Sequence, residues 1–127
     1  PEPMGATTIA AAKAGHAVPP VLDLTPMREI FGSITDDAKE LLQLFVDTTR
    51  PLVEETLRQL DGANSDLARE SAHSAKGAGN SAGCYRFAAI CAEIEHLCAD
   101  GYLVQAQTLA EPMEHAFSEA VEQIAAL

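Results

Sequence analysis

A run of residues whose types and spacing could support chemistry lies around His73, near the middle of the chain. Residues three and four apart share a face of a helix, so a histidine followed by Lys76 and Gly77 would present both beside its ring. On the same helix a set of mostly polar residues falls within about 60° of the His73 direction. The set comprises Asp66, Arg69, His73, Lys76, Gly77 and Asn80.

An imidazole that faces water can act as a nucleophile. The ring is uncharged for much of the time near neutral pH, so a ring nitrogen can attack phosphorus without a neighbouring base. Lys76 could reach the phosphoryl oxygens with its ammonium group, and Gly77 offers no side chain where a partner would approach. A glycine inside a helix costs about 0.5–1 kcal/mol relative to alanine, and this helix would contain Gly77 and Gly79. The pattern indicates phosphoryl chemistry on a docking face.

The elements that position this stripe are predicted to be helices. The 127 residues include no Trp and only 5% aromatics, which favours an all-α protein, and the chain is too short to add a nucleotide-binding kinase module. Gly83 should end the helix that carries His73, while Pro51 and Pro112 should kink their helices. Apolar periodicity predicts helices over 25–32, 35–60, 65–82, 85–99 and 102–127.

Short loops between four substantial amphipathic helices predict an antiparallel, up-and-down four-helix bundle with a short additional N-terminal helix. In that short helix Thr25 is the predicted N-cap, and Met27, Ile30 and Phe31 the apolar patch. We expect one domain over 21–127, preceded by a flexible tail or linker at 1–20. The buried face of the long second helix is predicted to comprise Ala38, Leu41, Leu42, Phe45, Leu52 and Leu60.

Charge narrows the range of partners. The net charge is −11, and all eight Lys and Arg residues lie at or before Arg86. Nucleic acids and anionic membranes are therefore not expected as partners. No apolar run reaches the roughly 18 residues that span a bilayer, and no leader sequence is evident, so we expect a cytoplasmic location.

Three cysteines, Cys84, Cys91 and Cys98, are spaced by seven residues and would lie along one stripe of a helix. We interpret them as reduced, buried thiols. Zinc binding with His96 is the alternative, but His96 points about 160° away from Cys98 on a helix, so no metal site is predicted. His16, His96 and His115 receive no functional role.

The run Ala72–Gly83 closely resembles the phosphorylation motif of histidine phosphotransfer domains, in which His is followed at three, four and ten residues by Lys, Gly and Gly. The residues Arg86-Phe87 and Ile90–Glu95 look like the next helix of that family. Val21–Asp23 and Leu44–Val46 resemble its opening segment and long helix, so the resemblance covers about 21–127. Two departures, Ala75 in place of a larger apolar residue and Cys84 in place of Ala, concern packing.

The resemblance implies that His73 accepts a phosphoryl group from the aspartate of a receiver domain and passes it to another receiver. Lys76 would steady the phosphoryl charge, and Arg69, Gly77 and Asn80 would contact the partner. The chain would be a phosphohistidine carrier without ATP-dependent kinase activity, and would need no cofactor because the receiver brings the Mg²⁺. Response-regulator receivers are the expected partners, a hybrid sensor kinase is a further candidate, and the family resemblance implies a monomer.

Two other functions stay open at this point. A helical interaction module could bind a partner through the same stripe without carrying a phosphoryl group, although such a module would not need His73. A fragment of an autophosphorylating kinase is the other alternative. Against it, the chain has no nucleotide-binding signature and lacks the Pro that usually follows the histidine in dimerising kinase helices.

Overall fold

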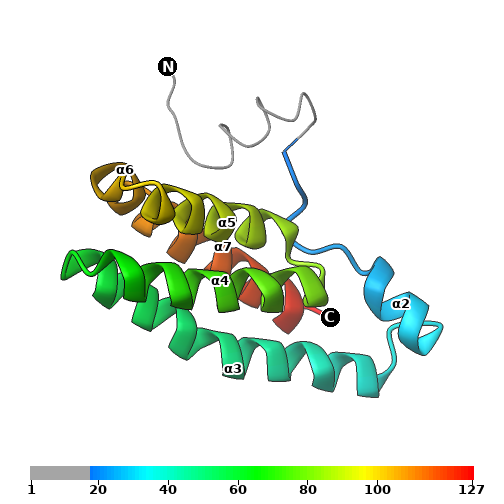
Figure 1. Cartoon of the computed structure of the whole chain (residues 1–127). Helices are drawn as coiled ribbons and strands as arrows, with labels where there is room; N and C mark the ends of the chain where they lie inside the picture. The colour runs from blue at the N-terminus through cyan, green and yellow to red at the C-terminus, as the bar shows by residue number, and fades with distance from the viewer. Residues whose placement is uncertain (1–17) are drawn as a thin grey trace.

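The computed structural model describes residues 18–127, so most of the predicted tail at 1–20 lies outside the described residues. The described part is helical and contains no strand, which confirms the predicted all-α class. In chain order the helices are α2 (Thr25–Phe31), α3 (Asp36–Asp61), α4 (Ser65–Ala82), α5 (Tyr85–Ala99), α6 (Leu103–Gln107) and α7 (Ala110–Ala125). The helices α3, α4, α5 and α7 run alternately up and down as a bundle, the short helix α2 stands at one end, and the short helix α6 precedes α7 (Figure 1).

The short helix α2 begins at Thr25 itself, so the prediction that Thr25 is the N-cap was wrong by one residue. Leu24 is the N-cap, and it has no side-chain oxygen to offer. The backbone N–H of Thr25 instead donates to Asp23 Oδ1 at 2.9 Å. Of the predicted apolar patch, Met27 is buried, whereas Ile30 is 63% exposed because it points away from the bundle.

The long helix α3 begins where the sequence predicts. Thr35 caps it by accepting a hydrogen bond from the N–H of Ala38 at 3.1 Å. The helix is continuous through Pro51, which lies on its exposed side. Leu41 was predicted to be buried but is 39% exposed, since the core lies a little further around the helix. The residues that complete the buried face are Val46, Thr49, Val53 and Thr56.

The helix α4 ends at Gly83 as predicted, because Gly83 adopts a left-handed conformation with φ of 83°. Earlier in α4, Gly79 lets α5 approach closely. A Cβ added at Gly79 would lie 3.0 Å from Phe87 Cδ2 and 3.2 Å from the Cβ of Ala88. This close packing brings α5 beside the His73 stripe.

The C-terminal part of the chain differs from the prediction. One helix over 102–127 with a kink at Pro112 was expected, but the chain forms α6 and α7 with a break at Thr108 and Leu109. Pro112 has no N–H to bond the carbonyl of Thr108, which favours a break there, although α3 accommodates Pro51 without one. Pro112 is the third residue of α7, where backbone N–H groups have no helical acceptor.

The core lies between α3, α5 and α7, where three phenylalanines meet. The ring centroids of Phe45 and Phe87 are 6.4 Å apart, those of Phe45 and Phe117 6.2 Å, and those of Phe87 and Phe117 5.4 Å. Such tilted and edge-on contacts add to the stabilisation from burial alone. On the α4 side the buried residues are small, so α4 packs close to α3 and α5.

Candidate functional site

His73 lies on the exposed side of α4, as predicted. Its side chain is 64% exposed, and Nδ1 lies 2.8 Å from Oε2 of Glu95 on α5. No residue in the described part of the chain bonds the other ring nitrogen, Nε2. The ring is therefore held at one nitrogen and open to solvent at the other.

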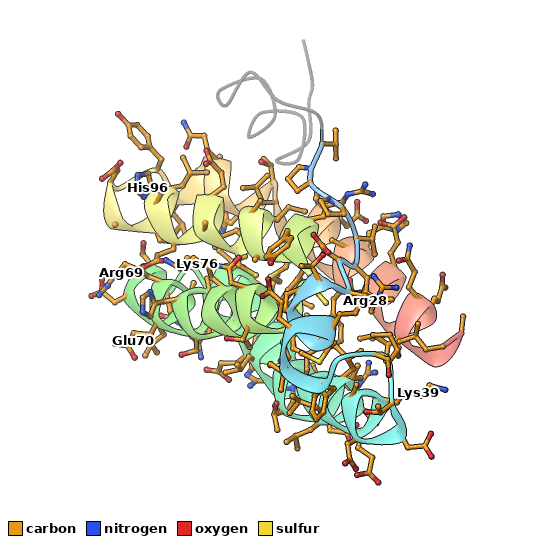
Figure 2. The ribbon with its side chains drawn as sticks, turned by 90° about the vertical axis from the view of Figure 1, so that its right-hand side faces the viewer. Arg28, Lys39, Arg69, Glu70, Lys76 and His96 are labelled. Carbon is orange, nitrogen blue, oxygen red and sulfur yellow. The ribbon has the colours of Figure 1, made fainter. Side chains whose placement is uncertain are left out.

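Glu95 connects the two residues of the predicted chemistry. Its second oxygen, Oε1, lies 2.8 Å from Nζ of Lys76, so one carboxylate binds both His73 and Lys76. The Glu95 side chain is 21% exposed and that of Lys76 30%, and Figure 2 shows Lys76 at the boundary between α4 and α5. Lys76 was expected to extend freely toward a phosphoryl group; in the resting protein it is paired with Glu95.

The electrostatics favour an ionised Glu95. Partial burial acts to raise the pKa of Glu95, but the hydrogen bonds and charges of Lys76 and His73 outweigh burial and hold that pKa below its usual value. A carboxylate can only accept hydrogen bonds, so Nδ1 of His73 must carry the proton that it donates. The lone pair is then on Nε2, which is the nitrogen that faces solvent.

The role of Glu95 was not predicted from the sequence. A signal was present, because Glu95 follows Cys91 by four residues and precedes Cys98 by three, and both cysteines are buried. Helical spacing therefore places this acid at the edge of a buried stripe, where an unpaired carboxylate would be costly. The sequence could not identify its partners, since they depend on how α4 and α5 pack.

The remaining residues of the stripe differ in their surroundings. Gly77 is exposed, and a Cβ added there would have no atom within 4 Å, so the surface beside His73 is open. Asn80 is exposed as well. Arg69 is half-buried and lies near Cys98. Burial raises the pKa of the Cys98 thiol, an effect that Ser65 and Arg69 only partly offset.

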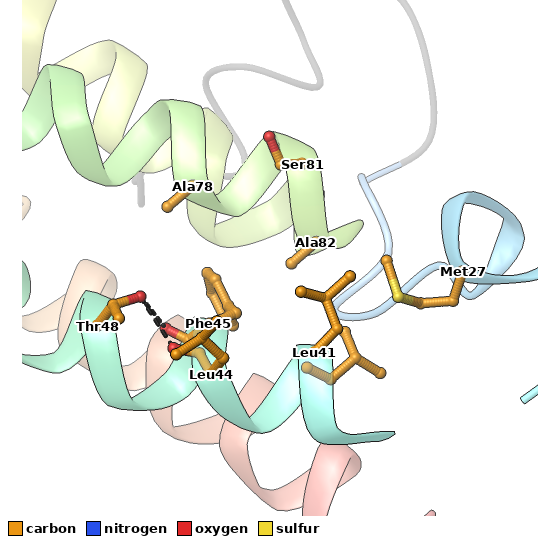
Figure 3. Close-up of a pocket in the computed structure, with 9 residues that line it drawn as sticks. Met27, Leu41, Leu44, Phe45, Thr48, Ala78, Ser81 and Ala82 are labelled. Carbon is orange, nitrogen blue, oxygen red and sulfur yellow. Dashed lines mark hydrogen bonds between the residues drawn. The ribbon is translucent and has the colours of Figure 1, made fainter. Parts of the chain in front are cut away.

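An apolar groove lies between α2, α3 and α4, on the part of α4 that follows Gly77 (Figure 3). Its volume is about 230 Å³. On its α3 side, Leu44 is 54% exposed and Leu41 39% exposed. The lining residues are Met27, Leu41, Leu42, Leu44, Phe45, Thr48, Ala78, Ser81 and Ala82.

The cysteines and His115 form no second site with the described residues around them. Cys84, Cys91 and Cys98 are free and buried, as interpreted from the sequence. Among residues 18–127, no three His, Cys, Asp or Glu side chains gather into a cluster that could hold a metal ion. His115 is exposed and lies 3.6 Å from Glu119 on the same helix. None of the helices in residues 18–127 has the length and apolarity needed to cross a membrane.

The chain matches one protein family and is similar to one solved structure. The model of the Hpt domain family matches residues 40–127, so α2 and the segment before it precede the match, and the predicted domain start at residue 21 stays a prediction. The chain is also similar to the crystal structure of histidine-containing phosphotransfer protein B (HptB) from Pseudomonas aeruginosa PAO1. The TM-score is 0.74 at 28% sequence identity, and the match covers 84% of this chain and 92% of that chain. No curated protein matches the chain.

Proposed function

This chain belongs to the histidine phosphotransfer (Hpt) domain family, which acts in phosphorelay signalling, and we propose that His73 is the residue on which it carries the phosphoryl group. One observation supports the assignment above the others. The Nδ1 atom of His73 is bound by Glu95 while Nε2 faces solvent, so the nitrogen with the lone pair is the one that a partner can reach.

The proposed reaction is a direct transfer between proteins. Nε2 of His73 attacks the phosphorus of a receiver aspartyl phosphate, the N–P bond forms, and the P–O bond to the aspartate breaks to leave a carboxylate. The proton on Nδ1 stays in its hydrogen bond to Glu95 throughout. The reverse sequence delivers the phosphoryl group to a second receiver, and positioning is the main contribution of this chain.

Lys76 supplies charge where the phosphoryl oxygens arrive. Its ammonium group is 2.8 Å from Glu95 in the resting protein, and the side chain is long enough to exchange that carboxylate for a phosphoryl oxygen. Phosphoryl transfer needs cationic charge on the phosphoryl oxygens, and Lys76 is the cation that this chain offers for that purpose. We assign the Mg²⁺ to the receiver. No cofactor is assigned to this chain.

Hpt domains interact with receiver domains, and we propose that a receiver docks over Gly77 and the apolar groove. Gly77 leaves room for close approach, and Leu41 and Leu44 offer exposed apolar surface on the neighbouring helix α3. Asn80 and Arg69 would contribute polar contacts at the two sides of His73. A hybrid sensor kinase carrying such a receiver is a further candidate partner.

The oligomeric state and the cellular location are also proposed. We propose a monomer, since the net charge of −11 opposes association between copies. We propose a cytoplasmic location, because three buried free thiols suit a reducing compartment. The alternative, a helical interaction module that carries no phosphoryl group, would use the same docking face.

The test charges a receiver with acetyl phosphate and mixes it with this protein. We expect acid-labile, alkali-stable label to appear on the wild type and on His96→Gln, whose histidine is exposed elsewhere, and not on His73→Gln. Label from ATP alone would favour the kinase fragment. Absence of label from every receiver tried would favour the interaction module.

A further inference from the structure

The segment 18–24, which we call the N-terminal strap, is held to the bundle by the burial of Val21 and by hydrogen bonds, two of which come from Arg86. Pro19 and Pro20 have no N–H groups, so the strap can bond there only through its carbonyl oxygens. Nε of Arg86 donates to the carbonyl oxygen of Pro19 at 3.0 Å, and the backbone N–H of Arg86 donates to that of Pro20, also at 3.0 Å.

Arg86 is suited to this task by its place in α5. It is the second residue of the helix, where a backbone N–H lacks a helical acceptor, and the N-cap residue Cys84 provides no side-chain cap. The carbonyl oxygen of Pro20 takes the place of that cap. The far side of the guanidinium lies 3.6 Å from Glu119 on α7, so the planar group is held between α7 and the strap.

The strap leads directly to the wall of the groove. The backbone N–H of Asp23 in the strap donates to the carbonyl oxygen of Gly83 at 2.8 Å. A Cβ added at Gly83 would lie 2.1 Å from the backbone carbonyl oxygen of Asp23. The strap therefore rests on the turn between α4 and α5. Asp23 then starts α2, in which Met27 lines the groove and is the buried residue of the helix.

The helix α2 has few other contacts: besides Met27, the partly buried Phe31 packs against the core. The helix is seven residues long, too short to be stable alone, and Ile30 on its outer side is 63% exposed. The location of α2 is consequently set at its start by the strap, at Met27 by the groove and at its end by Phe31. A strap that moved would carry α2 with it and change the shape of the groove.

We propose that Arg86 is a positioning residue for receiver docking: by fastening the strap to α5 and α7, it helps to fix α2 as one wall of the groove between α2, α3 and α4. The inference rests on the proposed function, because it assigns the occupant of the groove as a receiver domain. Arg86 takes no part in the transfer chemistry of His73, Lys76 and Glu95.

The test separates docking from chemistry with the variant Arg86→Gln in the full chain. Transfer from a charged receiver is measured over a range of receiver concentrations, and His73 is also labelled with phosphoramidate, a small donor that needs no docking. We expect the receiver KM to rise roughly three- to tenfold, the scale of a lost hydrogen bond, with an unchanged maximal rate and unchanged labelling by phosphoramidate. Amide hydrogen exchange at Asp23 and Arg86 should accelerate.

Two further variants sharpen the result. Arg58→Gln removes an exposed arginine of α3 that pairs with Glu55, so it should change none of these quantities. Gly83→Ala, whose Cβ would collide with Asp23, should displace the strap by another route and raise the receiver KM as well.

Unchanged exchange and an unchanged KM in Arg86→Gln would overturn the proposal, as would a loss of phosphoramidate labelling equal to the loss of receiver transfer. The proposed function can fail separately. A wild-type protein that no receiver and no phosphoramidate can label would contradict it, while hydrogen exchange would still report whether Arg86 holds the strap.

Discussion

At the scale of single residues, the proposed function divides the requirements of phosphoryl transfer among His73, Lys76 and Glu95. In that proposal His73 supplies the nucleophilic nitrogen, Lys76 the positive charge, and Glu95 the acceptor that keeps the proton on Nδ1. Both contacts of Glu95 are 2.8 Å long, the usual length of a charge-assisted hydrogen bond. Glu95 should therefore decide which nitrogen reacts.

Replacing Glu95 by Gln should slow transfer from a receiver by roughly 10- to 100-fold, because a carboxamide can also donate to Nδ1 and leave the proton on Nε2. In Glu95→Ala, part of the phosphoryl group should appear on Nδ1. Phosphorus NMR of the labelled protein distinguishes the two isomers, with Glu122→Gln on the exposed side of α7 as the control. A single isomer and an unchanged rate in both variants would contradict this role.

The pairing of Glu95 should also make stability depend on pH. The pKa of Glu95 is lower in the folded protein than its ordinary value of 4.5, so its contribution to the free energy of unfolding is fully present above that value. The contribution is lost as the pH falls through the folded pKa. Urea unfolding of wild type and Glu95→Gln at about pH 7 and about pH 3 should show a stability difference that shrinks in acid. A difference that grows in acid would disprove the pairing.

At the scale of elements, α4 uses two glycines for opposite purposes. Gly77 faces open space, whereas Gly79 faces Phe87 and Ala88 of α5 at distances that leave no room for a methyl group. The sequence shows that both glycines are costly inside a helix, but it does not distinguish their roles. In the structure Gly77 lies on an open surface, which we propose is the docking face, whereas Gly79 packs α4 on α5.

Matched alanine variants should separate the two glycines. Gly77→Ala should raise the free energy of unfolding by about 0.5–1 kcal/mol and slow receiver transfer, since the new methyl group projects from the docking face. Gly79→Ala should lower the free energy of unfolding by about 1–3 kcal/mol through overpacking. Urea titration and the receiver assay measure the two effects. A Gly77→Ala variant that accepted the phosphoryl group from a receiver as fast as wild type would show that docking does not require close approach at Gly77.

The helix α3 offers a second matched pair, Thr49 and Thr56, both fully buried. Thr56 Oγ1 lies 2.7 Å from Ser71 Oγ on α4, whereas Thr49 Oγ1 has no hydrogen-bond partner among the described residues. Thr49→Val should therefore raise the free energy of unfolding by about 1 kcal/mol, and Thr56→Val should lower it by about as much. Urea unfolding of both variants gives the comparison, and equal shifts of the same sign would refute it.

At the scale of the whole molecule, one core contains all three cysteines. Burial raises the pKa of the Cys84 thiol to about 12 and raises that of Cys91 further. A buried, protonated thiol is a poor nucleophile. The reactivity of these cysteines should consequently report the opening of the bundle.

Native protein at about pH 8 should react slowly with an aromatic disulfide reagent, and all three thiols should react at once after unfolding in urea. Cys98 should react first in the native state, because its side chain is the least buried of the three. Reaction of Cys91 as fast as a free thiol would show that the core between α3, α5 and α7 is open in solution.

Much of this protein could be predicted from the sequence because the signals are local. Helix limits follow from Thr35, Gly83 and the apolar periodicity, and the spacing of His73, Lys76 and Gly77 places them on one face of one helix. The break before α7 was missed, because the rule that a proline kinks a helix does not state whether the helix bends or begins again. The exposure of Leu41 was missed as well, since it depends on the rotation of α3 against its neighbours.

Local sequence patterns were enough to predict the fold class, the helix that carries His73 and the outward direction of its ring, since each depends on residues within a few turns of one another. Only the packing of the helices revealed that Glu95 binds Nδ1 and Lys76, that Gly77 and Gly79 have different surroundings, and that Arg86 bonds the strap. These are contacts between segments far apart in the chain. Their partners are set by how whole helices pack, and helical periodicity does not encode that packing.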